Sequence, residues 1–328
     1  MSISFYQSVP QDILETISNL DFSLGGQAKQ HEVNLLLEKT VLVGGKRLRP
    51  LLTMLMGRLV GIPNEQLAPY ARLIELLHAA SLAHDDVIDN ATMRRSVDSI
   101  NIVASNKKAV LAGDFLFAEV IVAVAQEGNL ELVQEVAKVI QQLSAGEWLQ
   151  LELAQERTID MQQVEEVARY KTASVLIWCS IVGVCLAKQQ KGDRDWTKLQ
   201  QLAYDFGLNL GLAFQFVDDT LDFDPTGQKD FMLDEENGVL NAVMVHWLNL
   251  DQQAREQFLA GQHCTPNLAD PLFQKAISKV RTLALEHLNL SRSCLQQMVK
   301  ELDLTVEQQQ AYATPLYELL DFLANRQY

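Results

Sequence analysis

The sequence is poor in cysteine, proline and glycine, and each scarcity excludes a class of protein. Four cysteines in 328 residues form no CxxC pair and no metal-ligand spacing, so we expect free thiols in a reducing compartment. Only 8 prolines and 16 glycines interrupt the chain, and aromatic residues make up 7%. Hydrophobic residues reach 48% and charged residues 21%, which argues against disorder. Abundant Leu, Ala, Gln and Glu favour helix.

Basic residues are also scarce. The 27 Lys and Arg are outnumbered by 42 Asp and Glu, which gives a net charge of −15. A surface of this sign repels nucleic acid phosphates and anionic membranes, so we expect neither as a partner. An anionic substrate therefore needs a local basic pocket.

Long apolar runs and targeting signals are missing as well. The first residues lack the basic and apolar regions of a secretory signal. The longest uncharged run, Thr172–Ala187, has 16 residues between Lys171 and Lys188 and falls short of the about 20 that span a bilayer. We interpret this run as a buried core helix, and we expect a cytoplasmic protein without a stable membrane anchor.

Helical periodicity covers most of the chain. Apolar residues recur three and four positions apart, and no alternating strand or hairpin pattern is convincing. The length alone suggests about two domains at roughly 150 residues each. No break is long enough for an interdomain linker, so we predict one all-α domain, 1-328, of ten or more helices. The expected helices include Leu67–Ile88, Val110–Ala125, Leu130–Leu143, Val164–Ala187, Leu199–Phe223, Leu233–Leu250 and Leu272–Leu302.

Two aspartate clusters are the strongest local feature. Asp85, Asp86 and Asp89 close one apolar helix, and Asp218, Asp219 and Asp222 close another with the same DDxxD spacing. Residues four apart share one helical face, where like charges repel unless a cation compensates. One such cluster is usually a solvated helix end, but two at the ends of apolar helices favour a metal–phosphate site. Mg²⁺ fits best, because it binds a few carboxylates together with phosphates and water. His84 is a candidate ligand, but a packing role is more common for such a residue.

Cations gather before and after the first cluster. The segment Gly44–Pro50 carries Lys46, Arg47 and Arg49, and its glycines let the backbone approach a ligand closely. Cations at a helix N-terminus make an anion site, and the alternative is a basic surface turn. Arg94 and Arg95 follow Asp89 and are able to pair with the carboxylates or with a phosphate. Lys171 is either an ordinary helix-boundary residue or a further phosphate ligand.

The order of these motifs resembles the trans-polyprenyl diphosphate synthases (E-type isoprenyl diphosphate synthases), in particular medium- and long-chain members such as octaprenyl or solanesyl diphosphate synthase. The resemblance covers roughly Val43 to Arg326 and rests on GGKRLRP, LLHAASLAHDDVIDNATMRR, NKKAVLAGDFLFAE, GEWLQLE, KTAS, GLAFQFVDDTLDF and LLDFLANR. It implies a helical bundle around a central tunnel, of the isoprenoid synthase type. It also implies a homodimer.

The same resemblance implies a Mg²⁺-dependent prenyltransferase, with Mn²⁺ as a substitute. Such an enzyme adds isopentenyl diphosphate to an allylic diphosphate, here farnesyl or geranyl diphosphate, by 1'-4 condensation with release of pyrophosphate. The allylic substrate ionises, C4 of isopentenyl diphosphate attacks the carbocation, and a proton leaves. Electrostatic stabilisation of pyrophosphate and exclusion of water are the requirements on the protein.

Site residues carry over by position. The resemblance assigns metal ligation to Asp85, Asp86, Asp89, Asp218, Asp219 and Asp222, and it counts all of these except Asp222, together with Lys171, as catalytic. It assigns substrate binding to Lys46, Arg49, His78, Arg94, Arg95, Lys171, Thr172, Gln215 and Lys229. Three departures from the family pattern are Ser96 after the first motif, Met232 after the second, and Gly238–Val243, where Val239 replaces a common Lys.

Product length is expected to depend on Ala80 and Ser81, one turn before the first motif. Short-chain members tend to have aromatic residues there, so small residues predict a product of about C30 to C50 by resemblance. Two alternatives stay open. One is a non-catalytic or regulatory helical subunit of a heterodimeric synthase, supported by the altered loop Met232–Val243. The other is a class I terpene cyclase, against which the second DDxxD and GGKRLRP argue.

Overall fold

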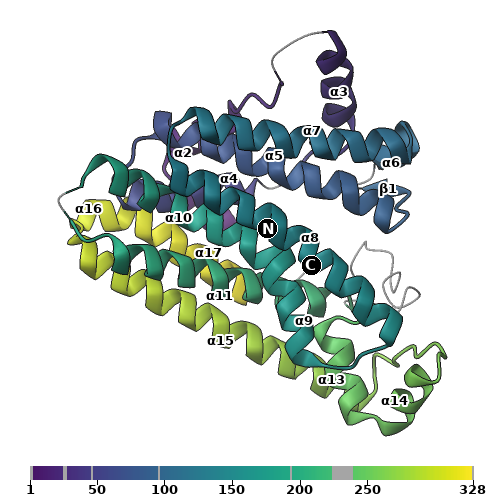
Figure 1. The fold of residues 1–328 in the computed structure, drawn as a ribbon. Helices are drawn as coiled ribbons and strands as arrows, with labels where there is room; N and C mark the ends of the chain where they lie inside the picture. Colours follow the sequence, from purple (N-terminus) through teal and green to yellow (C-terminus); the bar gives the residue numbers. More distant parts are fainter. Residues whose placement is uncertain are drawn as a thin grey trace.

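Helices make up almost all of the regular structure (Figure 1). The computed structural model describes residues 3–24, 28–45, 47–94, 97–192, 194–223 and 239–326. Its helices are α1 (Ile3–Ser8), α2 (Gln11–Ser18), α3 (Ala28–Lys39), α4 (Leu48–Leu59), α5 (Asn64–Ile88), α6 (Ile100–Val103), α7 (Asn106–Gln126), α8 (Leu130–Glu156), α9 (Met161–Ala168), α10 (Ser174–Gln190), α11 (Thr197–Leu221), α13 (Ala242–Leu250), α14 (Gln252–Leu259), α15 (Pro271–Leu302), α16 (Val306–Gln308) and α17 (Thr314–Ala324). The π-helical turns are η1 (Arg169–Ala173) and η2 (Gln309–Ala313). The all-α prediction is confirmed.

One short hairpin departs from the expected absence of strands. Strand β1 (Met93–Arg94) pairs antiparallel with β2 (Val97–Asp98). The prediction of no strand was wrong here because two residues a strand are too few to produce an alternating pattern. The hairpin follows the first aspartate motif and so fixes the path of the chain beside it.

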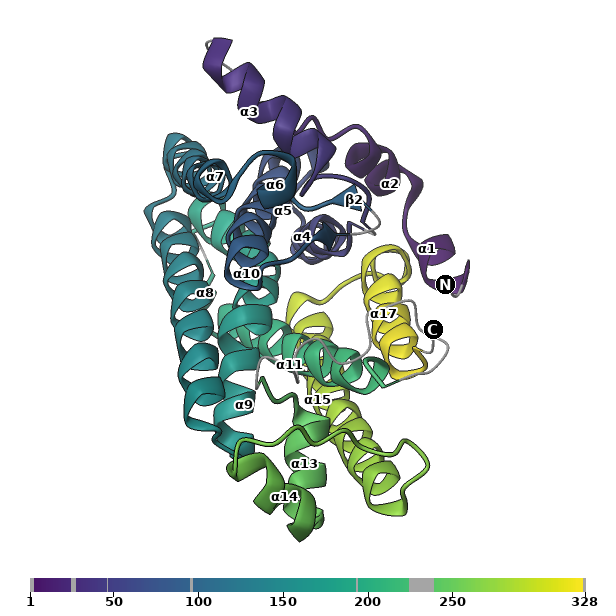
Figure 2. The same cartoon turned by 90° about the vertical axis from the view of Figure 1, so that its right-hand side faces the viewer.

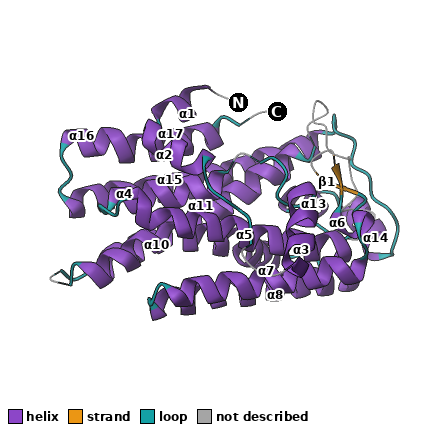
Figure 3. Cartoon of the chain, turned by 90° about the horizontal axis from the view of Figure 1, so that it is seen from above, coloured by secondary structure: helices purple, strands orange, loops and turns teal. Residues whose placement is uncertain are grey.

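Helix α10 lies in the middle of the bundle, packed against α4, α8 and α11 (Figures 2 and 3). All of its residues from Ser174 to Ala187 are buried. This confirms the interpretation of the uncharged run as a core helix. By length and hydropathy, Met161–Gln190 and α7 each meet the requirement for a membrane span, but 83% of the most apolar window of Met161–Gln190 is buried inside the protein. The corresponding share for α7 is 33%.

Small residues bring α11 against η1. A Cβ on Gly211 of α11 would lie 2.3 Å from Cα of Ala173, which is closer than any real contact. Glycine at this position therefore permits the close approach of the two backbones. Because Gly211 lies two turns before Asp218, this contact places the end of α11 beside Thr172.

Helix boundaries agree with the sequence in most places. Three expected helices (Leu67–Ile88, Leu199–Phe223 and Leu272–Leu302) coincide with α5, α11 and α15 within a few residues. Expected helix Val164–Ala187 instead consists of α9, η1 and α10. For the expected helix Leu233–Leu250, α13 begins at Ala242, and residues 233–238 lie outside the described residues. The single domain over 1-328 and the central tunnel stay predictions.

Candidate active site

The first aspartate motif forms the C-terminal end of α5. The Asp89 amide donates to the Asp85 carbonyl over 2.8 Å, so helical geometry continues to Asp89 and keeps both on one face. Asp86 points elsewhere and is fully buried. Its carboxylate accepts from Nε of Arg94 at 2.6 Å and from the Ile100 amide at 3.4 Å. Asp86 therefore ties the end of α5 to β1 and α6, while Asp85 and Asp89 lie nearer the solvent.

The second motif repeats this arrangement at the end of α11. Asp219 is 2% exposed and accepts from the Ala242 amide at 3.0 Å and from Nε2 of Gln215 at 2.8 Å. Asp218 and Asp222 are half-buried on the neighbouring face. In both motifs the second aspartate anchors the helix end to the following element, and the first and third, called the outward aspartates here, are more exposed than the second.

Burial controls the protonation of two of these carboxyls. It raises the pKa of Asp85 to about 7, against the opposing effect of the Lys171 ammonium, and Glu147 and Asp89 add to the rise. Burial likewise raises the pKa of Asp219 to about 7, although its two hydrogen bonds oppose the shift. A cation is the natural compensation for such clustered carboxylates.

Lys171 lies on the π-helical turn η1, a feature that is frequent at functional sites. Its Nζ is 2.5 Å from a carboxylate oxygen of Glu147 and donates to Oε1 of Gln150 at 3.0 Å. Both partners come from α8. Gly146 makes room for this contact, because a Cβ there would lie 2.8 Å from Cγ of Lys171. The α8–η1 contact thus positions the ammonium whose charge acts on Asp85.

Thr172, the next residue of η1, connects to the second motif. Its Oγ1 donates to Oε1 of Gln215 over 2.6 Å, and Gln215 in turn donates to Asp219. The adjacent residues Lys171 and Thr172 therefore contact the surroundings of the first and second motifs respectively. Through these two residues η1 connects the ends of α5 and α11, while the joint metal site of the paired motifs stays a prediction.

A cavity of about 650 Å³ lies beside Thr172. Its charged lining comes from Arg47, Arg49, Glu75 and Arg326, and the rest includes Gly44, Gly45, Phe214 and Phe322. Arg47 Nη1 pairs with the buried Glu75 at 2.5 Å, and Arg326 Nη1 pairs with Asp218 at 2.7 Å. The buried Nε of Arg49 has no hydrogen-bond partner among the described residues, and burial lowers the pKa of this guanidinium. The cavity therefore has the donors to bind an anion.

Several predicted substrate residues lie near this cavity. Arg49 and Thr172 line it directly. His78 is half-buried on α5 between the two ends of the helix, and Arg94 pairs with Asp86. The predicted binding residues Lys46, Arg95 and Lys229 lie outside the described residues.

His84 packs against α7. Its Nε2 is 3.0 Å from the Val110 carbonyl oxygen and 3.4 Å from Asp114, and its ring lies over Gly113. The packing interpretation of His84 is consistent with these contacts.

Four residues of the site were not among the predicted binding or catalytic residues: Arg47, Glu147, Gln150 and Arg326. Arg47 lay inside a recognised basic segment, and Glu147 and Gln150 lay inside the quoted GEWLQLE, one helical turn apart. Only the contact of α8 with η1 gives these two residues a role. Arg326 is more than a hundred positions from its partner Asp218, and no local pattern indicates such a contact.

The carboxylates at the two helix ends fit a hard cation whose remaining ligands come from water and a substrate. Among the described residues, no three His, Cys, Asp or Glu side chains converge to form a complete metal site. The outward aspartates at the two helix ends supply carboxylate oxygens only. Mg²⁺ prefers such ligands and usually keeps water and substrate phosphates as the rest of its shell.

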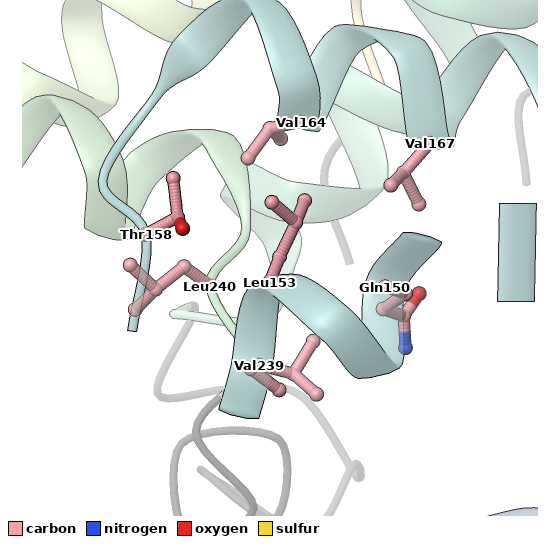
Figure 4. Close-up of a pocket in the computed structure, with 8 residues that line it drawn as sticks. Gln150, Leu153, Thr158, Val164, Val167, Val239 and Leu240 are labelled. Atoms are coloured by element: carbon pink, nitrogen blue, oxygen red, sulfur yellow. The ribbon is translucent and has the colours of Figure 1, made fainter. Parts of the chain in front are cut away.

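A small pocket of about 40 Å³ has Gln150 in its lining (Figure 4). Leu153 of α8, Val164 and Val167 of α9, and Val239 converge there. Val239, which departs from the family pattern, thus packs as an apolar residue against α8 and α9. It joins the chain after the second motif to the helix that holds the Lys171 partners.

Comparison with known proteins agrees with this helical architecture. A family model described as polyprenyl synthetase matches residues 30–276. The solanesyl-diphosphate synthase 1 of Oryza sativa is 35% identical over 269 residues, which cover 75% of this chain and 61% of that protein. A prenyl transferase of Porphyra purpurea is 33% identical and covers 86% of each chain. The chain thus spans about three fifths of the rice relative.

Solved structures show the same fold. A decaprenyl diphosphate synthase from Rhodobacter capsulatus superposes with a TM-score of 0.79 at 25% identity, with 98% of each chain covered. A polyprenyl synthase from Caulobacter crescentus, complexed with calcium and isoprenyl diphosphate, gives 0.81 at 24% identity and covers 100% of this chain and 99% of that one. The fold is that of the isoprenoid synthases. The chain belongs to the polyprenyl synthetase family.

Proposed function

We propose that this protein is a trans-polyprenyl diphosphate synthase that adds isopentenyl diphosphate to an allylic diphosphate by 1'-4 condensation. The observation that carries the proposal is the convergence of two aspartate motifs and a basic cavity on the Lys171–Thr172 pair. Two anionic substrates require two neighbouring sites of positive charge, one from metal and one from arginine. The relatives named solanesyl-diphosphate synthase and prenyl transferase support the same activity.

The outward aspartates Asp85, Asp89, Asp218 and Asp222 would hold Mg²⁺ together with the allylic diphosphate. Bound Mg²⁺ supplies charge neutralisation for the departing pyrophosphate. Buried Asp86 and Asp219 hold the helix ends in place through their hydrogen bonds. The Caulobacter protein is complexed with calcium and isoprenyl diphosphate, which supports the use of a divalent cation.

The residues of the chain prepare the reacting groups. Lys171, held by Glu147 and Gln150, faces the first motif and contributes its ammonium to the pyrophosphate. Arg49 and Arg47 bind the diphosphate of the second substrate in the cavity, where the partnerless Nε of Arg49 gains an acceptor. Phe214 and Phe322 cover the cavity and exclude water, which would otherwise quench the carbocation.

We further propose a product of about C30 to C50. Ala80 is fully buried in the core on α5, and Ser81 turns its hydroxyl back to the His78 carbonyl at 2.9 Å. Neither side chain is large enough to block a tail that follows α5 away from Asp85. Relatives named for solanesyl and decaprenyl products support this range. A cytoplasmic location stays a prediction.

A homodimer through α7 and α8 forms part of the proposal. The two helices lie together on one side of the molecule (Figure 2). Their outer surface and the adjoining α6 expose large apolar side chains: Ile102, Val103, Leu111, Val122, Leu130 and Trp148. An apolar surface of this kind usually marks a protein interface.

The test is an incorporation assay on the protein alone with labelled isopentenyl diphosphate, farnesyl diphosphate and Mg²⁺. We expect Mg²⁺-dependent elongation that chelation by EDTA abolishes. An Asp85→Ala variant is expected to lose turnover while its circular dichroism spectrum stays that of the wild type. No elongation by the wild type would favour a non-catalytic subunit, and release of a hydrocarbon would favour a terpene cyclase.

A further inference from the structure

The last described residue, Arg326, lies on the second aspartate motif. Its Nη1 donates to Oδ1 of Asp218 over 2.7 Å, and its guanidinium carbon lies 5.4 Å from the ring centroid of Phe214. Phe214 and Asp218 are one helical turn apart on α11, so Arg326 covers one face of that helix. The side chains are only 19% and 25% exposed. We propose that Arg326 is a metal-responsive latch, which occupies Asp218 in the metal-free protein and is displaced when a divalent cation binds there.

Competition for one carboxylate is the physical basis of the latch. A guanidinium in a hydrogen bond with Oδ1 blocks that oxygen and adds a positive charge that opposes an incoming cation. A divalent cation that uses Asp218 therefore competes with Arg326 for the carboxylate. The inference rests on the proposed metal role of Asp218.

The construction of the C-terminal end allows this movement. Apolar residues of α17, among them Leu316, Leu320 and Leu323, are buried and fix the helix to the core. Beyond Ala324 the chain is held by the Asn325 and Arg326 amides, which donate to carbonyls of the preceding turn. Rotation of the Arg326 side chain alone is enough to break the pair with Asp218. The released guanidinium stays at the cavity that Arg47 and Arg49 line, because Arg326 itself is part of that lining.

Such a latch links the two halves of the site. When metal binds Asp218, the positive charge of the Arg326 guanidinium no longer neutralises that carboxylate and becomes available to an anion in the cavity. Without metal, that charge is neutralised and Asp218 is closed. The order of binding that follows is metal before the anion in the cavity.

The test measures divalent cation binding directly. Free Mn²⁺ is titrated by electron paramagnetic resonance in the full-length protein without any diphosphate. The variants are Arg326→Gln and, as a matched control, Arg292→Gln. Like Arg326, Arg292 of α15 pairs with an aspartate and lies over an aromatic ring. Its aspartate is Asp321 of α17, and Arg292 is not part of the cavity lining.

We expect Arg326→Gln to bind Mn²⁺ about two- to fivefold more tightly than wild type, the range that a partly exposed ion pair supports. Arg326→Lys should restore much of the wild-type affinity, and Arg292→Gln should leave it unchanged. Thermal denaturation of each variant verifies folding.

Unchanged or weaker Mn²⁺ binding by a folded Arg326→Gln variant would overturn the latch, as would failure of the wild type to bind Mn²⁺. The elongation assay is separate from this readout. Elongation without the affinity change leaves the proposed function standing and removes the latch. The affinity change without elongation supports the latch and removes the synthase activity.

Discussion

Thr172 donates a hydrogen bond from Oγ1 to Oε1 of Gln215, and this 2.6 Å contact fixes which end of the Gln215 amide faces Asp219. With Oε1 occupied by Thr172, Nε2 is directed to the Asp219 carboxylate at 2.8 Å. The chain of contacts continues to the Ala242 amide. One hydroxyl on η1 thereby orients the Gln215 amide of α11 toward the carboxylate that also binds the start of α13.

Replacement Thr172→Val tests this relay. Valine keeps the shape and the β-branch but removes the donor, so the Gln215 amide loses its fixed orientation. We expect kcat to fall by up to about tenfold, the equivalent of one hydrogen bond. Steady-state kinetics with isopentenyl diphosphate measure the change. Thr282→Val is the matched control, because the Thr282 hydroxyl bonds only to the Ser278 carbonyl on the exposed side of α15. Equal kinetics in both variants would remove Thr172 from the site.

Gly146 is expected to be intolerant of a side chain. In Gly146→Ala the new Cβ would lie 2.8 Å from Cγ of Lys171 and from Cβ of Tyr170, so α8 and η1 have to separate. We expect a loss of about 1–3 kcal/mol in the free energy of unfolding and a larger loss of turnover, since Lys171 moves away from Asp85. Denaturant titration and kinetics measure both.

Gly192→Ala provides the comparison for Gly146. Among the described residues, a methyl group on Gly192 would have no atom within 4 Å apart from its chain neighbours, and the φ of Gly192 is not positive. This variant should keep wild-type stability and turnover. A Gly146→Ala variant that behaves in the same way would contradict the packing argument.

Local sequence predicted the helices that carry the chemistry but not the contacts between them. The DDxxD spacing and apolar periodicity placed Asp85 and Asp218 at helix ends, because both signals depend on neighbours a few residues away. The π-helical turn that presents Lys171 and Thr172 had no such signal, since it depends on the close packing of α11 at Gly211. Arg326 is a stronger case, because its partner is brought near only by the docking of α17.

Because the pKa of Asp219 is raised, ionisation of this carboxyl destabilises the folded protein, and the free energy of unfolding is expected to depend on pH. Burial raises this pKa from 3.8 to about 7, so the folded protein favours the protonated form. The contribution of protonated Asp219 to the free energy of unfolding is therefore complete below about pH 4 and is lost as the pH rises through about 7. Asp219→Asn removes this loss, so we expect the metal-free variant to melt a few degrees above wild type at pH 8 and near wild type at pH 5.

A calorimetric pH series on the Asp219→Asn variant measures this effect. Asp195→Asn is a control of opposite sign, because hydrogen bonds from Thr197 lower the pKa of Asp195. That variant should gain no stability at pH 8. If Asp219→Asn melts below wild type at pH 8, the carboxylate is stabilising and the assigned burial cost is wrong. Turnover of Asp219→Asn should fall in either case, since the variant alters the second motif.

The exposed apolar surface of α7 and α8 predicts an effect of charge on assembly. Leu111 is 66% exposed on α7, so Leu111→Glu costs little in a monomer but places a charge in the proposed interface. We expect sedimentation velocity to show a dimer for wild type and a monomer for Leu111→Glu. Val306→Glu, at a residue of α16 that is 80% exposed, should remain dimeric. A wild-type monomer at micromolar concentration would exclude the homodimer.

Bulk at Ala80 is expected to shorten the product. Ala80 is fully buried one turn and a residue before Asp85, about 7.5 Å along α5, and in the proposed function the tail passes its small methyl group. Ala80→Phe places a ring across that path, while Ala80→Val adds only two methyl groups. We expect the chromatographic product distribution to shift to shorter chains in Ala80→Phe and by less in Ala80→Val. The rate constant for the first condensation should stay near the wild-type value even though the product becomes shorter, because the substitution leaves the aspartates in place. An unchanged distribution from a folded, active Ala80→Phe variant would place the length determinant elsewhere on α5.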